Sequence, residues 1–233
     1  MCTMYTLHLQ LLTLSTNMNM ANKTTIQIKR STYRHGDLYR ALLDAAVQLA
    51  RKGGAEAVVL REVTRQAGVS PNAAYRHFAD RHALLQAVSM AAQSALAVEI
   101  ENEINRIGKS EDQLELARAR LRAVGTAYLR FALAEPGLFG MAFSVPNDLS
   151  NADNPASAGE SGLTAYQLLG TALDKLIEAG AITQERRQFA EIFAWSAVHG
   201  FAKLMLEGPL RSLDKTQAEV IGQRLIDVVE RGL

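Results

Sequence analysis

The sequence contains a single cysteine, Cys2, among 233 residues. This scarcity excludes an intrachain disulfide and any zinc site built on several cysteines. No uninterrupted apolar run approaches the roughly 18 residues that a membrane-spanning helix needs. We therefore expect no membrane segment and a cytoplasmic protein. Because 48% of the residues are hydrophobic, the chain can still bury a sizeable core.

The first 22 residues carry no charge, so they lack the positive start of a secretory signal. We interpret residues 1–32 as a disordered tail or an over-extended start, with Met18 or Met20 as alternative initiators. The tail ends in basic residues that could form an arm touching DNA or could simply be solvated. These residues are Lys23, Lys29 and Arg30, with Arg34 just beyond them.

Alternation typical of strands is also missing, and apolar residues instead recur at helical spacing. The fold class expected is all-α, with a helix-turn-helix domain over residues 33–80 and a helical bundle over residues 81–233. Residues 138–143 predict a short apolar turn, and residues 145–162 a polar surface loop. The expected helices are 37–52, 60–67, 71–78, 80–107, 111–134, 163–179, 184–206 and 215–231.

The stretch from Leu60 to Leu85 predicts two short helices joined by a tight turn. Gly68 stands where the first should end, since glycine tolerates the left-handed backbone of such a stop. Ser70 can cap the second helix, and Pro71 suits its first position. Val59 precedes the first helix and offers no side-chain cap. The apolar seam expected between the helices consists of Val63, Ala67, Val69, Ala74 and Phe78.

The segment LREVTRQAGVSPNAAYRHFADRHALLQAV resembles the signature of the TetR/AcrR family of bacterial transcriptional regulators. Its matching features are AGVS, the form YxHF and a charged residue before LL. The segments WSAVHGFAKLMLEG and EPGLFGMAFS resemble a Trp-His-Gly subclass of the family's ligand-binding domains. The resemblance implies a regulator that binds DNA as a dimer and a small molecule in its C-terminal bundle.

Charge is distributed unevenly along the chain. Residues 23–82 hold 11 Lys and Arg against 5 Asp and Glu, a net charge of +6, whereas residues 83–233 hold 14 against 19, a net charge of −5. A basic amino-terminal module on an acidic body favours phosphate binding at one end. We therefore expect double-stranded DNA as the partner.

The second short helix and its neighbours supply the candidate DNA contacts. Asn72 can bind adenine and Ala73 can meet a thymine methyl, whereas Arg76 could bind guanine, a phosphate or only solvent. Family positions imply phosphate contacts for Tyr75 and His77, although Tyr75 could instead be a packing residue. Arg81, at the start of the next helix, could make a further phosphate contact through its charge and the helix amino terminus. The full expected set is Ser70, Pro71, Asn72, Ala73, Tyr75, Arg76, His77 and Arg81.

Aromatic and Met side chains of the C-terminal part are the candidates for a cavity that would suit an apolar or aromatic effector. Each has a competing role in core packing. For His199 the alternatives are a hydrogen bond to the ligand or one to a neighbouring helix. The candidates are Tyr128, Phe131, Phe139, Met141, Phe143, Tyr166, Phe193, Trp195 and His199.

The last two helices have more apolar surface than one partner could cover. Pairing with their copies would make a four-helix homodimer interface. The alternative is a monomer in which both helices are buried in the core. Such a dimer would place two recognition helices about one DNA turn (~34–36 Å) apart on a palindromic operator.

Patterns for catalysis are missing: no phosphate-binding glycine loop, no His-Glu metal spacing and no Glu-x-x-His pair. His77 and His82 lie too far apart along a helix to form a metal pair. We expect no enzyme activity, no metal and no cofactor. The alternative function is a DNA-organising protein without a sensor. The expected mechanism is a two-state repressor, with the helix from Asp80 linking the modules.

Overall fold

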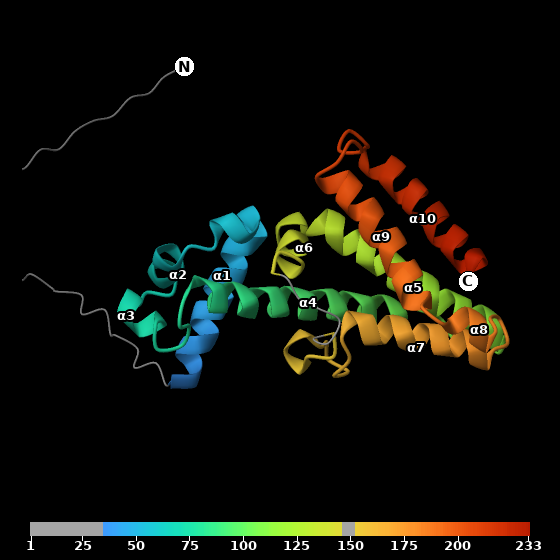
Figure 1. Ribbon diagram of the computed structural model, residues 1–233, viewed down its shortest axis with the longest axis horizontal. Helices are drawn as coiled ribbons and strands as arrows, with labels where there is room; N and C mark the ends of the chain where they lie inside the picture. The colour runs from blue at the N-terminus through green and yellow to red at the C-terminus, as the bar shows by residue number, and fades with distance from the viewer. Residues whose placement is uncertain (1–34, 146–151) are drawn as a thin grey trace, which may run out of the picture. The chain divides into compact units, whose positions relative to one another are not determined.

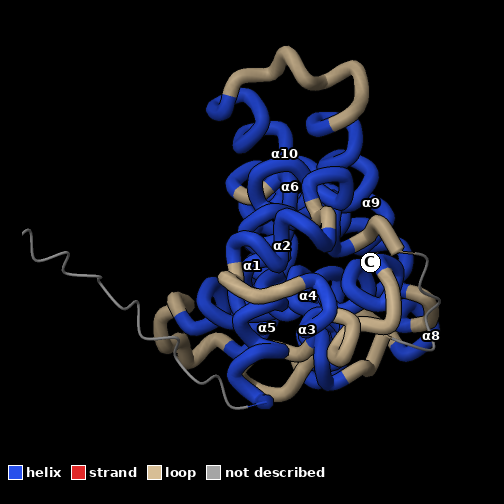
Figure 2. The backbone as a smooth tube through the Cα atoms, turned by 90° about the vertical axis from the view of Figure 1, so that its left-hand side faces the viewer, coloured by secondary structure: helices blue, strands red, loops and turns tan. Residues whose placement is uncertain are grey.

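A computed structural model describes residues 35–145 and 152–233, which form helices with no β-strand among them (Figure 2). The all-α prediction is confirmed. The predicted tail with its basic arm, and residues 146–151 of the predicted loop, lie outside the described residues. All described residues belong to one compact unit, so the proposed domain boundary at residue 80 stays a prediction.

Ten α-helices and one short 3₁₀ helix make up the described part (Figure 1). They are α1 (His35–Ala57), α2 (Leu60–Gln66), α3 (Pro71–Ala74), α4 (Arg81–Asn105), α5 (Gln113–Ala134), α6 (Pro136–Ala142), η2 (Pro155–Ser157), α7 (Ala165–Glu178), α8 (Gln184–Arg187), α9 (Ala190–Leu206) and α10 (Lys215–Gly232).

Glycine backbone geometry divides the first three helices as predicted. Gly53 and Gly54 are non-helical within α1, with φ +62° at Gly54, and Gly68 follows α2 with φ +69°. A φ in this range favours glycine over residues that carry a Cβ. The predicted seam is confirmed, since Val63, Ala74 and Phe78 are buried and the remaining members pack against them.

The second short helix differs from the prediction in two respects. α3 is α-helical only to Ala74, and beyond it the chain continues in turns with hydrogen bonds from the N–H groups of His77 and Phe78 to the Ala74 carbonyl. Ser70 occupies the N-cap position, but its side chain makes no capping hydrogen bond. The prediction that Ser70 caps this helix is therefore wrong, and Pro71 at the first position has no N–H to satisfy.

α4 begins after Asp80, whose carboxylate accepts a hydrogen bond from the N–H of Ala83 at 2.8 Å. It packs against α1, α5, α6 and α7 and buries Leu84, Val88, Leu96 and Ile100. Among the described helices, α4 alone is long and apolar enough to cross a membrane by length and composition. This finding departs from the prediction made from uninterrupted apolar runs, but 44% of its most apolar window is buried inside the protein, which favours a core helix.

The segment predicted as an apolar turn after Pro136 is a helix, α6. Leu138, Phe139, Met141 and Ala142 on it are buried, and it packs against α1, α4 and α5. The prediction failed because Pro136 and Gly137 are strong breakers by sequence, yet proline is well suited to a first helical position. Tertiary packing of four apolar side chains then stabilises a short helix.

Candidate DNA-binding surface and ligand cavity

The outer face of α3 presents most of the predicted DNA-contact residues to solvent. Ser70, Pro71, Asn72 and Arg76 are exposed, and the side chain of Tyr75 is 56% exposed. Such exposure is inconsistent with the alternative in which Tyr75 packs in the core. The surface therefore combines a basic side chain with polar ones on a short helix, as insertion into a DNA major groove requires.

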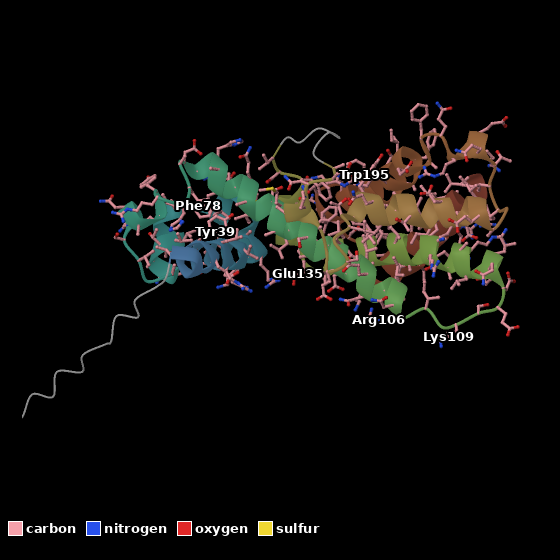
Figure 3. The ribbon with its side chains drawn as sticks, turned by 90° about the horizontal axis from the view of Figure 1, so that it is seen from below. Tyr39, Phe78, Arg106, Lys109, Glu135 and Trp195 are labelled. Carbon is pink, nitrogen blue, oxygen red and sulfur yellow. The ribbon has the colours of Figure 1, made fainter. Side chains whose placement is uncertain are left out.

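The remaining members of this surface, Ala73 and His77, are half-buried. Tyr39 on α1 stacks on Phe78, with ring centroids 5.1 Å apart, and meets the edge of His77 at 6.2 Å (Figure 3). Tyr39 was not anticipated from the sequence, because only the fold brings α1 against the end of α3. Its ring limits the positions that His77 can take.

Arg81 has a structural role that the sequence did not predict. Its Nε donates to the Val58 carbonyl at 3.2 Å and its Nη2 to the Ala55 carbonyl at 2.9 Å. These two hydrogen bonds tie the start of α4 to the connection between α1 and α2. A phosphate contact by Arg81 stays a prediction, but its Nε and Nη2 already donate hydrogen bonds within the protein.

A cavity of about 470 Å³ lies among α4, α5, α7, α9 and α10. Cavities of this size accommodate small organic ligands. Its walls are mostly aliphatic and aromatic. They are formed by Gln93, Leu96, Ile100, Leu121, Val124, Gly125, Tyr128, Ala142, Phe143, Val145, Ala152, Ser157, Thr164, Ala165, Tyr166, Leu169, Ala194, Trp195, Val198, Ile226 and Val229.

Four of the predicted ligand-binding residues line this cavity: Tyr128, Phe143, Tyr166 and Trp195. Four others are absent from the described residues that line it. Phe131, Phe139 and Met141 are buried in the core, and His199 stands behind the wall against Tyr128. Periodicity indicates which residues face inward, but it does not distinguish a cavity from close packing.

Phe193 is likewise absent from the residues that line the cavity. It is 65% exposed, and Phe189, four residues earlier, is 60% exposed. On a helix that is apolar nearly all round, sequence alone did not indicate which face turns inward. Wall residues that the sequence analysis missed include Leu96 on α4 and Ile226 on α10, and the apolar surface of the last helix had been assigned to a dimer interface.

A hydrogen-bonded group of aromatic side chains stands at the cavity wall. The Trp195 Nε1–H donates to the Tyr128 hydroxyl at 3.1 Å, and that hydroxyl lies 2.7 Å from Nδ1 of His199. Burial raises the pKa of the Tyr128 phenol and lowers the pKa of His199. Both groups are therefore neutral near pH 7, and the alternative in which His199 contacts a neighbouring helix is the one observed.

The same aromatic group connects the cavity to α6. Phe139 on α6 contacts Tyr128, Phe143 and His199, with ring centroids 5.6, 5.3 and 5.6 Å away. In the first turn of α6, Gly137 lies so close to α1 that an added Cβ would be 2.4 Å from the Ala50 carbonyl oxygen. α6 therefore lies between the cavity wall and the DNA-binding helices.

Ion pairing and hydrogen bonds strengthen both ends of α6. Glu135, which is labelled in Figure 3, lies at its start and pairs with Arg51 of α1 at 2.8 Å. At its end the Ala142 carbonyl accepts hydrogen bonds from Ser89 and Gln93 of α4, at 3.0 and 2.8 Å.

Within residues 35–145 and 152–233, no group of three or more His, Cys, Asp and Glu could hold a metal ion.

Comparisons with known proteins agree with this arrangement. The model of the tetR family of bacterial regulatory proteins matches residues 42–88, and that of the tetracyclin repressor-like C-terminal domain matches residues 121–229. Together these matches cover more than half of the chain. No curated protein matches the sequence.

Solved structures share the fold. A protein of unknown function from Rhodococcus sp. RHA1 is 29% identical, with a TM-score of 0.64, 87% of this chain and 98% of that chain being covered. The transcriptional regulator FadR from Bacillus subtilis, in complex with stearoyl-CoA, is 16% identical, with a TM-score of 0.60, 84% of this chain and 99% of that chain being covered. RolR, in complex with resorcinol, is 18% identical, with a TM-score of 0.55 and 85% and 88% covered. The chain therefore belongs to the TetR family and is a DNA-binding transcriptional regulator.

Proposed function

We propose that the protein is a ligand-responsive repressor that binds a palindromic operator as a homodimer in the cytoplasm. The observation that carries this proposal is the position of α6. One end of α6 contacts the aromatic wall of an apolar cavity, and the other packs without a gap against α1 of the DNA-binding module. A ligand that moved the wall would have a direct mechanical path to the recognition helix.

DNA binding would use the outer face of α3. Asn72 is the candidate for base recognition, since its amide can bind adenine bidentately, and Ala73 can contact a thymine methyl. Tyr75 and His77 are candidates for phosphates, and Arg76 for a base or a phosphate. Arg81 contributes chiefly by holding α4 against α1 and α2.

Dimerisation would use the exposed apolar faces of α9 and α10. Phe193, Val220 and Val228 are each more than half exposed, and Ile192, Leu204 and Ile221 are exposed to at least 41%. Large apolar side chains exposed on two helices that pack together favour a protein interaction site. Two copies of α9 and α10 paired across a twofold axis would bury it in a four-helix interface and present two recognition helices to one operator.

Repression and release would follow from two states of the dimer. The ligand-free state would match the operator spacing, and occupation of the cavity would favour a state with displaced recognition helices. α4 and α6 are the linking elements, because each packs against both α1 and α5. A coupling free energy of about 1–3 kcal/mol would lower operator affinity roughly 5- to 150-fold.

The test is a selection of genomic DNA fragments by the purified full-length protein at two salt concentrations. Recovery of a short palindrome, bound by a dimer with salt-dependent affinity, would support the proposal. The palindrome then serves as a probe for release, with resorcinol as the first compound because a protein of similar fold binds it. Binding without sequence preference would support a DNA-organising protein instead and refute specific repression.

A further inference from the structure

The composition of the cavity wall restricts the chemistry of its ligand. No Lys, Arg, Asp or Glu is among the described residues that line it. Arg187, which lies on α8 beside Tyr166, is already bound by Asp174 at 2.8 Å and by Glu191 at 2.6 Å. An ionised group entering the cavity would lose its hydration without gaining a counter-charge, and such desolvation is costly.

Three polar side chains of the wall are committed to the protein itself. The amide of Gln93 donates to the Ala142 carbonyl at 2.8 Å. The hydroxyl of Thr164 donates to the Ala152 carbonyl at 2.7 Å and accepts from the N–H of Gln167. The Trp195 N–H has one hydrogen to give, and it is given to Tyr128. A ligand rich in polar groups would find few partners here.

The Tyr128 hydroxyl is held by the ring nitrogens of Trp195 and His199 and retains one further hydrogen-bonding position. A phenol has one donor and two acceptor sites. If the phenol donates to Nδ1 of neutral His199 and accepts from Trp195, one acceptor site remains. If instead the imidazole carries its proton on Nδ1 and donates, both acceptor sites are filled and the phenolic O–H is available. The position is an acceptor in one tautomer and a donor in the other.

We propose that the cavity takes a neutral, mainly apolar molecule with one hydroxyl group, and that this hydroxyl hydrogen-bonds to Tyr128. A hydroxyl can both donate and accept, so it matches either tautomer, whereas a hydrocarbon matches neither. His199 acts as a positioning residue that orients the Tyr128 phenol. The cavity volume equals that of about 16 water molecules, which suits a ligand of roughly that many non-hydrogen atoms. This inference rests on the proposed ligand-responsive function.

The experiment compares three probes of similar size at about pH 8: 4-octylphenol, octylbenzene and 4-octylbenzoate. Trp195 is the single tryptophan of the chain and lines the cavity, so its fluorescence reports binding without DNA. We expect 4-octylphenol to bind roughly fivefold more tightly than octylbenzene, as one neutral hydrogen bond provides. We expect 4-octylbenzoate to bind at least about 100-fold more weakly than 4-octylphenol.

Two variants separate the cavity from other sites. Tyr128→Phe should remove the preference for 4-octylphenol over octylbenzene while octylbenzene still binds. Ala165→Phe, which places a ring in the cavity, should abolish binding of all three probes. Equal or tighter binding of 4-octylbenzoate, an unchanged preference in Tyr128→Phe, or no binding of any probe by the unmodified protein would overturn the inference. If the probes bind in the expected order but operator DNA is not released, the ligand class stands and ligand-responsive repression fails.

Discussion

Gly137→Ala is the substitution that most directly tests whether α6 is packed against the DNA-binding module. The added Cβ would lie 2.4 Å from the Ala50 carbonyl oxygen and 2.6 Å from the Arg51 carbonyl oxygen. Both obstructing atoms are backbone, so no side chain can rotate away, and α6 or α1 must shift. The adjacent ion pair between Arg51 and Glu135 would be displaced as well.

The magnitude follows from two opposing effects. Forcing extra volume into a packed contact costs about 1–3 kcal/mol, whereas replacing glycine by alanine in a helix gains about 0.5–1 kcal/mol. We therefore expect the free energy of unfolding to fall by about 1–2 kcal/mol. For a chain of this size that corresponds to a Tm about 2–8 °C lower.

Gly140→Ala is the matched control, because it lies in the same helix and its added Cβ would meet nothing within 4 Å. It should raise the Tm slightly. The measurement is thermal unfolding by circular dichroism, followed by operator binding of both variants. If Gly137→Ala were as stable as Gly140→Ala and bound the operator equally well, the close contact between α6 and α1 would be refuted.

Three further predictions concern separate surfaces. Asn72→Ala should relax sequence preference at one operator position, whereas Tyr75→Phe should weaken binding to all sequences by about fivefold. A selection of randomised operators distinguishes the two effects, and an unchanged preference in Asn72→Ala would refute base recognition by Asn72. Phe193→Glu should convert the dimer to monomer in sedimentation experiments, while Lys109→Glu, an exposed charge change outside α9 and α10, should not. An intact dimer in Phe193→Glu would place the interface elsewhere. Because burial lowers the pKa of His199, the unfolded chain binds this proton more readily. The contribution of neutral His199 to stability is fully present above the ordinary pKa of 6.5 and is lost as the pH falls through the pKa of the folded state. The Tm of the protein should therefore fall more than the Tm of His199→Gln between about pH 8 and pH 5. Equal decreases in the two Tm values would contradict a lowered pKa of His199.

Much of the DNA-binding module could be predicted because its signals are local. Glycine permits the positive φ angles found at Gly54 and Gly68, and these positions end helical segments whatever surrounds them. The buried faces at Val63 and Phe78 follow from helical periodicity within a few turns. The exception is Ser70, whose side chain had a plausible capping role that the folded backbone does not use.

The cavity could not be predicted to the same extent, because it depends on contacts between helices far apart in the sequence. Tyr128 and Trp195 were expected near a ligand, and both line the wall, but Phe131 and Met141 have the same pattern and are packed in the core. Phe193 lies one turn from inward-facing positions and points outward. Side-chain size and spacing alone do not reveal where packing leaves a space.

Sequence by itself determined the helical class, the glycine stops and the face of the recognition helix, since each arises from interactions within a few residues. Tertiary structure alone decided three other features: that α6 is a helix, that Arg81 binds the Ala55 and Val58 carbonyls, and that Tyr128 joins Trp195 and His199 at a cavity. These features require groups separated by more than 20 positions to meet, and only the closed fold places them within hydrogen-bonding or packing distance.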